Sequence, residues 1–172
     1  SLTETSSEGK KTRLLFDPLW REVLHAGLWS CALRWATLTP VTLTTPDGCP
    51  LSNVFPLPTD CVRVSDVEPT DIEYCKQRFP ASSWTGQTVA TDVLRASVSS
   101  LKVKYVSLIT ADLADELLAE AFIARLASAL ALSCLKDANA ANLLESQYRR
   151  IILPQTRYYA ALEQRSHKRA YH

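Results

Sequence analysis

The chain of 172 residues contains no methionine, only four glycines and only three histidines. Glycines this few and scattered exclude a glycine-rich loop that cradles phosphates. The sequence patterns of nucleotide-binding loops, zinc peptidases and serine hydrolases are also absent. Because these patterns are absent, we expect no enzymatic activity, no cofactor and no metal. Because the chain has no methionine, residue 1 is expected to follow processing or to lie at a fragment edge.

Five cysteines are widely spaced and never in CxxC pairs, which argues against zinc: Cys31, Cys49, Cys61, Cys75 and Cys134. Their odd number predicts reduced thiols in a cytoplasmic setting rather than a disulfide framework. No run of 18 apolar residues is free of charge, so no membrane span is expected.

The N-terminal part of the sequence predicts a helix over residues 7–26, capped by Ser6 or Ser7. Pro18 predicts a kink or a new start inside this helix, and Gly27 predicts its end. His25 is interpreted as a helix-end residue rather than a catalytic base.

The middle of the chain is rich in proline, with seven of nine prolines between Pro40 and Pro80. This excludes long helices there. Segments 62–67 and 101–106 alternate apolar and polar residues, as half-buried strands do, with Lys102 and Lys104 outward.

The last third predicts a long helix from Asp112, followed by a second from about Ala138 to Gln164 with a kink or restart at Pro154. Beyond Phe122 the first of these helices is apolar on nearly every face. A helix of this kind is buried on several sides. One small chain supplies that burial with difficulty, so the tract predicts packing between subunits.

Together these zones predict one α+β domain over 1–172: a helical bundle, made of the N-terminal helix and two long C-terminal helices, with a small, mainly antiparallel β-region inserted between them. The zones are a helix at 7–30, a β-rich docking region at 31–110, a helical pair at 111–165 and a basic tail at 166–172. The expected helical core combines one stripe of residues with the N-terminal helix: Leu117, Leu118, Phe122, Leu126 and Leu130 with Leu14, Val23 and Leu24.

Carboxylates cluster between Asp60 and Glu73, an arrangement that a glycosidase could use. They lie on a strand and in the loop that follows it. This favours carboxylates that are exposed to solvent at a sheet edge and in a turn. Asp60 follows Pro58 at a strand entrance and is expected to accept backbone N–H bonds, with Arg63 on the polar face of the strand. Three tryptophans could stack on nucleobases, but their apolar neighbours favour core packing: Trp20, Trp29 and Trp35.

Charge is uneven, because residues 149–172 carry +5 and the preceding residues −4. A basic terminal segment is typical of a surface for an acidic partner or nucleic acid, and a solvated helix end is the alternative. Tyr and Arg are enriched at protein interfaces. The candidates for a partner interface are therefore Arg149, Arg150, Arg157, Tyr158, Tyr159, Arg165, Lys168 and Arg169.

Several segments, in order, resemble the head-to-tail adaptor family of tailed bacteriophages, also called tail tubular protein A. Residues 55–64 match the family's leucine-proline-x-aspartate-cysteine-x-arginine-valine element, which contains Pro58, Asp60 and Arg63. The other similar segments are 16–29, 34–38, 103–110 and 122–131, with the last helical portion starting at Tyr148. The family's additional first helical segment is missing here, and residues 74–87 and the basic tail follow no family pattern.

The resemblance implies a structural virion protein made in the host cytoplasm. It would form a ring, usually of twelve copies, beneath the portal at the capsid vertex and above a tail or nozzle protein. The ring would extend the channel through which double-stranded DNA passes without sequence-specific contacts, and it would contact no membrane. Residues 149–169 are then expected to dock on the portal. Two alternatives remain open: a virion-associated cell-wall or polysaccharide hydrolase using Asp60 and Glu68, and a monomeric nucleic-acid-binding domain using the basic tail.

Overall fold

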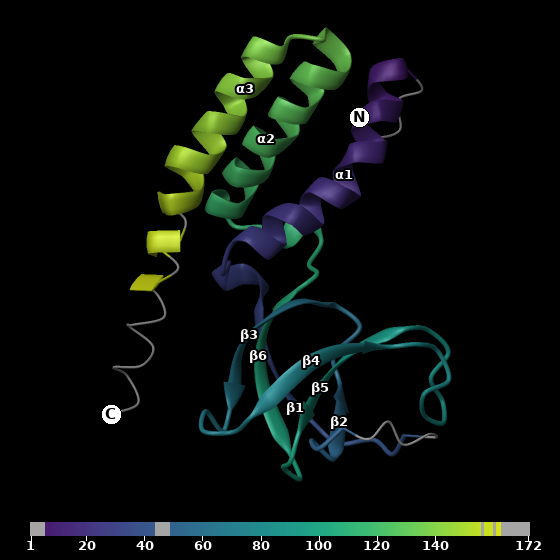
Figure 1. Cartoon of the computed structure of the whole chain (residues 1–172). Coiled ribbons are helices and arrows are strands. Elements are labelled where there is room, and N and C mark those ends of the chain that lie inside the picture. Colours follow the sequence, from purple (N-terminus) through teal and green to yellow (C-terminus); the bar gives the residue numbers. More distant parts are fainter. Residues whose placement is uncertain (1–5, 44–48, 156, 160, 163–172) are drawn as a thin grey trace. The chain divides into compact units, whose positions relative to one another are not determined.

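The computed structural model describes residues 6–43, 49–155, 157–159 and 161–162. The chain divides into two compact units. The helical unit comprises residues 1–33 and 108–172, and the β unit comprises residues 34–107. Figure 1 traces the elements of both units along the chain. That residues 1–172 act as one domain stays a prediction.

Helix α1 spans Ser7–Ala26, which confirms the expected range. The hydroxyl oxygen of Ser6 accepts a hydrogen bond of 3.1 Å from the backbone N–H of Gly9, which satisfies one free donor of the first turn. The helix continues through Pro18 as a single element, so the expected new start is wrong. Gly27 ends the helix with extended backbone, as expected.

Helix α2 spans Glu116–Leu130 and begins at Asp115, whose carboxylate accepts a 2.8 Å bond from the backbone of Leu118. The chain then forms a π-helix over Ala131–Leu135 and turns at Lys136, which has left-handed backbone. In Figure 1, α2 is followed by this turn and by α3, which returns alongside it.

Helix α3 spans Ala138–Gln147, capped by the carboxylate of Asp137. A second π-helix, Tyr148–Ile152, follows and leads directly into helical residues 153–155. Pro154 lacks an N–H and its ring crowds the carbonyl four residues earlier. The wider turn of a π-helix just before it is the kind of local change that accommodates such a defect. The irregularity expected at Pro154 therefore lies upstream of it.

The core of the helical unit is built around aromatic rings from α1 and α2. Phe122 stands edge-on to both Phe16 and Trp20, with ring centroids 4.9 and 5.0 Å apart. Val23, Leu24 and Leu118 are fully buried, as expected. Leu14 was predicted to join them but is 76% exposed, and Leu117, Leu126 and Leu130 are only half-buried.

The β unit consists of two three-stranded sheets, ordered β1-β6-β3 and β2-β5-β4. The paired strands β2–β5, β4–β5 and β3–β6 are antiparallel. The strands are β1 (Leu33–Leu38), β2 (Asn53–Pro56), β3 (Cys61–Glu68), β4 (Tyr74–Phe79), β5 (Thr91–Ala96) and β6 (Leu101–Ser107).

Both sheets contribute to one hydrophobic core. Its buried members are Leu38, Phe55, Leu57, Val67, Leu94, Ala96, Leu101, Val103 and Tyr105. A β unit with two sheets and a core of its own corrects the prediction of a small β-region inserted in a helical bundle. The prediction failed because several strands are short and their surface positions are polar, as in β4, where exposed and half-buried residues alternate.

Candidate functional site

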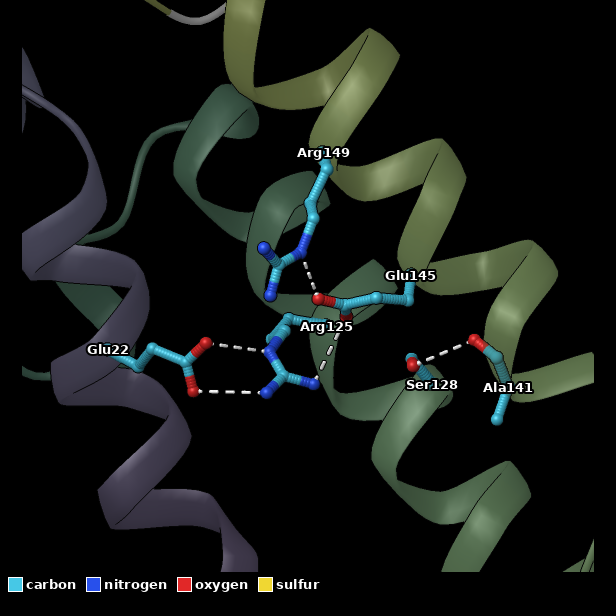
Figure 2. A network of polar contacts seen from close by, with 6 residues as sticks. All are labelled: Glu22, Arg125, Ser128, Ala141, Glu145 and Arg149. Atoms are coloured by element: carbon cyan, nitrogen blue, oxygen red, sulfur yellow. Dashed lines mark hydrogen bonds and ion pairs between the residues drawn. The ribbon is translucent and has the colours of Figure 1, made fainter. Parts of the chain in front are cut away.

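An ion-pair network joins the three helices of the helical unit (Figure 2). The guanidinium of Arg125, on α2, donates to both carboxylate oxygens of Glu22, on α1, at 2.9 and 3.2 Å. Its other terminal nitrogen lies 3.2 Å from Oε2 of Glu145, on α3. Glu145 also pairs with Arg149, one turn further along. Arg125 is therefore the residue through which α1, α2 and α3 are linked electrostatically.

The network combines burial with charge pairing. The side chains of Arg125 and Glu145 are only 20% and 24% exposed. The hydrogen bonds that Arg125 donates to Glu22 raise the pKa of Arg125 above its ordinary value. Tyr148 is buried beside these groups, and its burial raises the pKa of the phenol. In the sequence, Arg125 stands as a single charge within the otherwise apolar stretch that follows Phe122. A lone arginine in such a helix was the signal for a buried pairing site.

Large apolar side chains remain exposed on every helix of this unit. Ile123, on α2, is 65% exposed, and Leu143, on α3, is 69% exposed. The turn between these helices adds Leu132 and Leu135, and α1 adds Leu14. Water-soluble proteins often expose single leucines, but repeated large apolar residues over a few neighbouring helices are typical of a binding surface. The exposed large apolar residues of α2, α3 and the turn between them are Ile123, Leu132, Leu135 and Leu143.

One helical stretch, Glu116–Leu135, is long and apolar enough to cross a membrane by length and composition alone. The core helices of soluble proteins pass the same test. Within this stretch Leu118, Ala121 and Phe122 are buried against other parts of the helical unit, and Arg125 is ion-paired on two sides. These contacts pack one side of the stretch against its neighbours, and 28% of its most apolar part is buried.

The basic segment is only partly described. Arg149 and Arg150 are exposed on the second π-helix, and Tyr158 and Tyr159 are 62% and 50% exposed with their rings edge-on. Arg157 donates to the backbone carbonyl of Ala26, at the end of α1, with the shorter bond 3.1 Å. The remaining candidates lie outside the described residues: Arg165, Lys168 and Arg169.

Asp60 is held by side chains rather than by local backbone donors. Ser107 donates a 2.6 Å hydrogen bond to its carboxylate, and Tyr105 a longer one of 3.4 Å. The carbonyl of Pro58 accepts the N–H of Cys61, which closes the turn that places Asp60 at the start of β3. Arg63 is half-buried and pairs in register with Val106 of β6. The three motif residues thus connect the entrance of β3 to the end of β6.

Two of the three tryptophans are core residues, as expected, since Trp20 and Trp29 are 5% and 2% exposed. Trp35 is 47% exposed, so its predicted place in the core is wrong. It lies on the outer strand β1, and the ammonium groups of Lys102 and Lys104 stand 4.6 and 5.7 Å from its ring centroid. The apolar and polar residues that alternate along 101–106 predicted that both lysines point outward. The indole of Trp35 lies on the same face of the sheet as these lysines.

Glu68, the second acid of the hydrolase alternative, forms an exposed ion pair with Lys102 at 3.5 Å. Among the residues that the structure describes, no three His, Cys, Asp or Glu side chains gather as metal ligands do. Neither a scan against protein-family models nor a search of curated proteins finds a match to this chain.

Proposed function

We propose that this chain is a structural protein that assembles into a ring through its helical unit and, in the virion of a tailed phage, joins the portal to the tail. The observation that carries the proposal is the mismatch on α2 between sequence and burial. The helix is apolar nearly all round, yet Ile123 lies 65% exposed on it. Burial of such side chains against a second copy would stabilise an assembly by about 1.5–3 kcal/mol for each side chain fully buried.

A ring with cyclic symmetry needs two different surfaces on each copy. In a ring each copy offers one surface to the next copy and a different surface to the previous one. The ion-pair network around Arg125 supports this role because it fixes the three helices on which those surfaces lie. A rigid set of helices loses less freedom on association than a mobile one.

The surface is tested with Ile123→Glu and Leu143→Glu, compared with Val89→Glu. Val89 is 63% exposed but belongs to the β unit, so it is a matched control for adding one charge. Light scattering coupled to size exclusion, with and without purified portal, should find rings for the original chain and for Val89→Glu. Each helical variant should weaken assembly about 30-fold or more, because a buried unpaired charge costs at least about 2 kcal/mol.

The far-ultraviolet spectrum and the unfolding midpoint of each variant establish that it is folded. Monomers for the original chain under all conditions, including with portal, would refute the proposal. Rings that tolerate both helical substitutions would move the interface away from α2 and α3.

Within this proposal, the basic segment 149–169 docks on an acidic rim of the portal. A positive charge repeated around a ring favours such docking. Arg157 is partly engaged with Ala26 of its own chain, whereas Tyr158 and Tyr159 are exposed for a partner. Deleting residues 155–172 should abolish portal binding and leave a folded protein. Unchanged affinity of the deletion variant would place the docking surface elsewhere.

A further inference from the structure

Two cysteines that lie 26 positions apart in the sequence come together at one end of the sheet β2-β5-β4. Ala96 of β5 is paired with Asn53 of β2 on one side and with Tyr74 of β4 on the other. The start of β2 and the start of β4 therefore lie at the same end of this sheet. Cys49 precedes the first of these strands, and Cys75 is the second residue of the other.

Arg95 brings the segment before β2 over the face that carries Cys75. Arg95 and Cys75 are directly paired across β5 and β4, so their side chains leave the sheet on the same face. The guanidinium of Arg95 is 2% exposed and donates twice to the carbonyl of Leu51, at 3.0 and 2.8 Å. Because Leu51 follows Cys49 by two residues, this clamp also fixes the position of Cys49.

The two thiols are in contact as a result. Burial raises the pKa of Cys75, and its interaction with the neighbouring Cys49 raises it further; both residues are half-buried. The clamp on Leu51, the register of β4 and this contact are three separate observations of one arrangement. We propose that Cys49 and Cys75 form a redox-active dithiol, which a low-molecular-weight disulfide such as oxidised glutathione converts into an intramolecular disulfide.

The reaction is two successive thiol–disulfide exchanges. One cysteine loses its proton to solvent, and its thiolate attacks a sulfur of oxidised glutathione, forming a mixed disulfide and releasing one glutathione thiolate. The second cysteine, also deprotonated, attacks the protein sulfur of the mixed disulfide and releases the other glutathione thiolate. The protein is oxidised by two electrons and one oxidised glutathione is reduced to two thiols. Burial raises the pKa of Cys75, so the exchange should be slow at neutral pH.

The disulfide would tie the segment before β2 to the outer strand β4. It would therefore add a covalent link between two edges of one sheet that β5 and the Arg95 clamp already join in the reduced protein. The reducing cytosol keeps such a pair as thiols, and an oxidising environment converts it. The inference does not depend on the proposed assembly, because it concerns contacts inside the β unit.

The test treats the full chain with oxidised glutathione and maps its peptides without reduction. A linked pair of peptides containing Cys49 and Cys75 is expected, with the mass of the intact chain lower by two hydrogen atoms. The thermal midpoint should rise by about 5–10 °C and return after reduction. Cys134→Ser, in the helical unit, serves as the matched control and should behave as the original chain does.

Cys49→Ser and Cys75→Ser should each gain a glutathione adduct on the remaining cysteine and lose the rise in midpoint. Adducts on both cysteines of the original chain without a cross-link would overturn the proposal, as would a cross-link between other cysteines. The same map decides the matter if either serine variant fails to fold. A cross-link that leaves the midpoint unchanged would refute its role in fixing the sheet edges.

Discussion

The carboxylate of Glu22 binds the guanidinium of Arg125 through two hydrogen bonds, of 2.9 and 3.2 Å, and so links α1 to α2. Bidentate pairs of this kind are stronger and more specific than single contacts. Replacing Arg125 by methionine should lower the free energy of unfolding by about 1–3 kcal/mol, because Glu22 loses its two bonds to Arg125 and the partly buried Glu145 keeps only its pair with Arg149.

Urea unfolding measures this loss. Lys102→Met is the control, since it breaks an exposed pair with Glu68 at 3.5 Å and should cost less than about 1 kcal/mol. Equal losses for the two variants would mean that the network around Arg125 is no stronger than a surface pair.

Truncating Phe122 to alanine should cost about 3–5 kcal/mol of unfolding free energy. Phe122 is 7% exposed and contacts the rings of Phe16 and Trp20. The adjacent Ile123→Ala, on the exposed side of α2, should cost well under 1 kcal/mol in the monomer. A loss of that small size at Phe122 would show that the aromatic cluster is not the core of the helical unit.

Adding one methyl group at Gly27 should destabilise the helical unit by about 1–3 kcal/mol. A Cβ at this position would lie 2.5 Å from Cε2 of Trp29. The indole cannot move aside easily, because it is buried and its N–H donates a 2.9 Å bond to the carbonyl of Val23. In a Trp29→Leu background the cost of Gly27→Ala should shrink, and thermal unfolding of the four proteins of this cycle tests the coupling.

Stability should fall steeply in alkali because of Cys61. Burial raises the pKa of this thiol from 9.0 to about 11. The folded protein then keeps its proton at a pH where the unfolded chain has lost it. The resulting stabilisation is complete below pH 9 and disappears as the pH rises to about 11. Urea unfolding of Cys61→Ala at successive pH values should show a shallower decline than the original chain over this range. Parallel declines would contradict the raised pKa.

Replacing Asp60 by asparagine should leave any assembly largely intact. The amide keeps an oxygen that can accept from Ser107, and it loses the charge that strengthens the 2.6 Å bond. A loss of about 1–2 kcal/mol in unfolding free energy is expected. A hydrolytic activity on peptidoglycan or capsule that Asp60→Asn abolishes would instead support the hydrolase alternative.

Local signals in the sequence predicted α1 and the start of α3 well, whereas α2 begins at Glu116 and not at the predicted Asp112, which lies in a 3-10 turn over Ala111–Leu113. The range of α1, its cap at Ser6 and its end at Gly27 follow from residues that lie within a few positions of one another. The start of α3 at Ala138 is also predicted by a neighbouring residue, because Asp137 is of a type that favours the N-cap position of a helix. Helical spacing also identified the buried positions Val23, Leu118 and Phe122.

Pairings between distant segments could not be read in the same way. Trp35 has the composition of a core residue, and its exposure depends on which face of β1 turns outward. Leu14 follows the helical stripe but is 76% exposed, although Lys11, three residues earlier, contacts the carbonyl of Ser133. The bond from Ser107 to Asp60 and the contact of Cys49 with Cys75 depend on strand register, which short polar strands specify weakly.

The division of the chain has a consequence for the order in which the protein folds during synthesis. The β unit is one continuous stretch, 34–107, whereas the helical unit needs both the first 33 residues and those after 107. Trp20 leaves the ribosome long before Phe122 and the carbonyl of Ile109, its partners in the finished protein. The β unit can therefore fold while the chain is still growing. Until α2 emerges, the apolar face of α1 stays exposed, and at this stage the nascent chain most needs a chaperone.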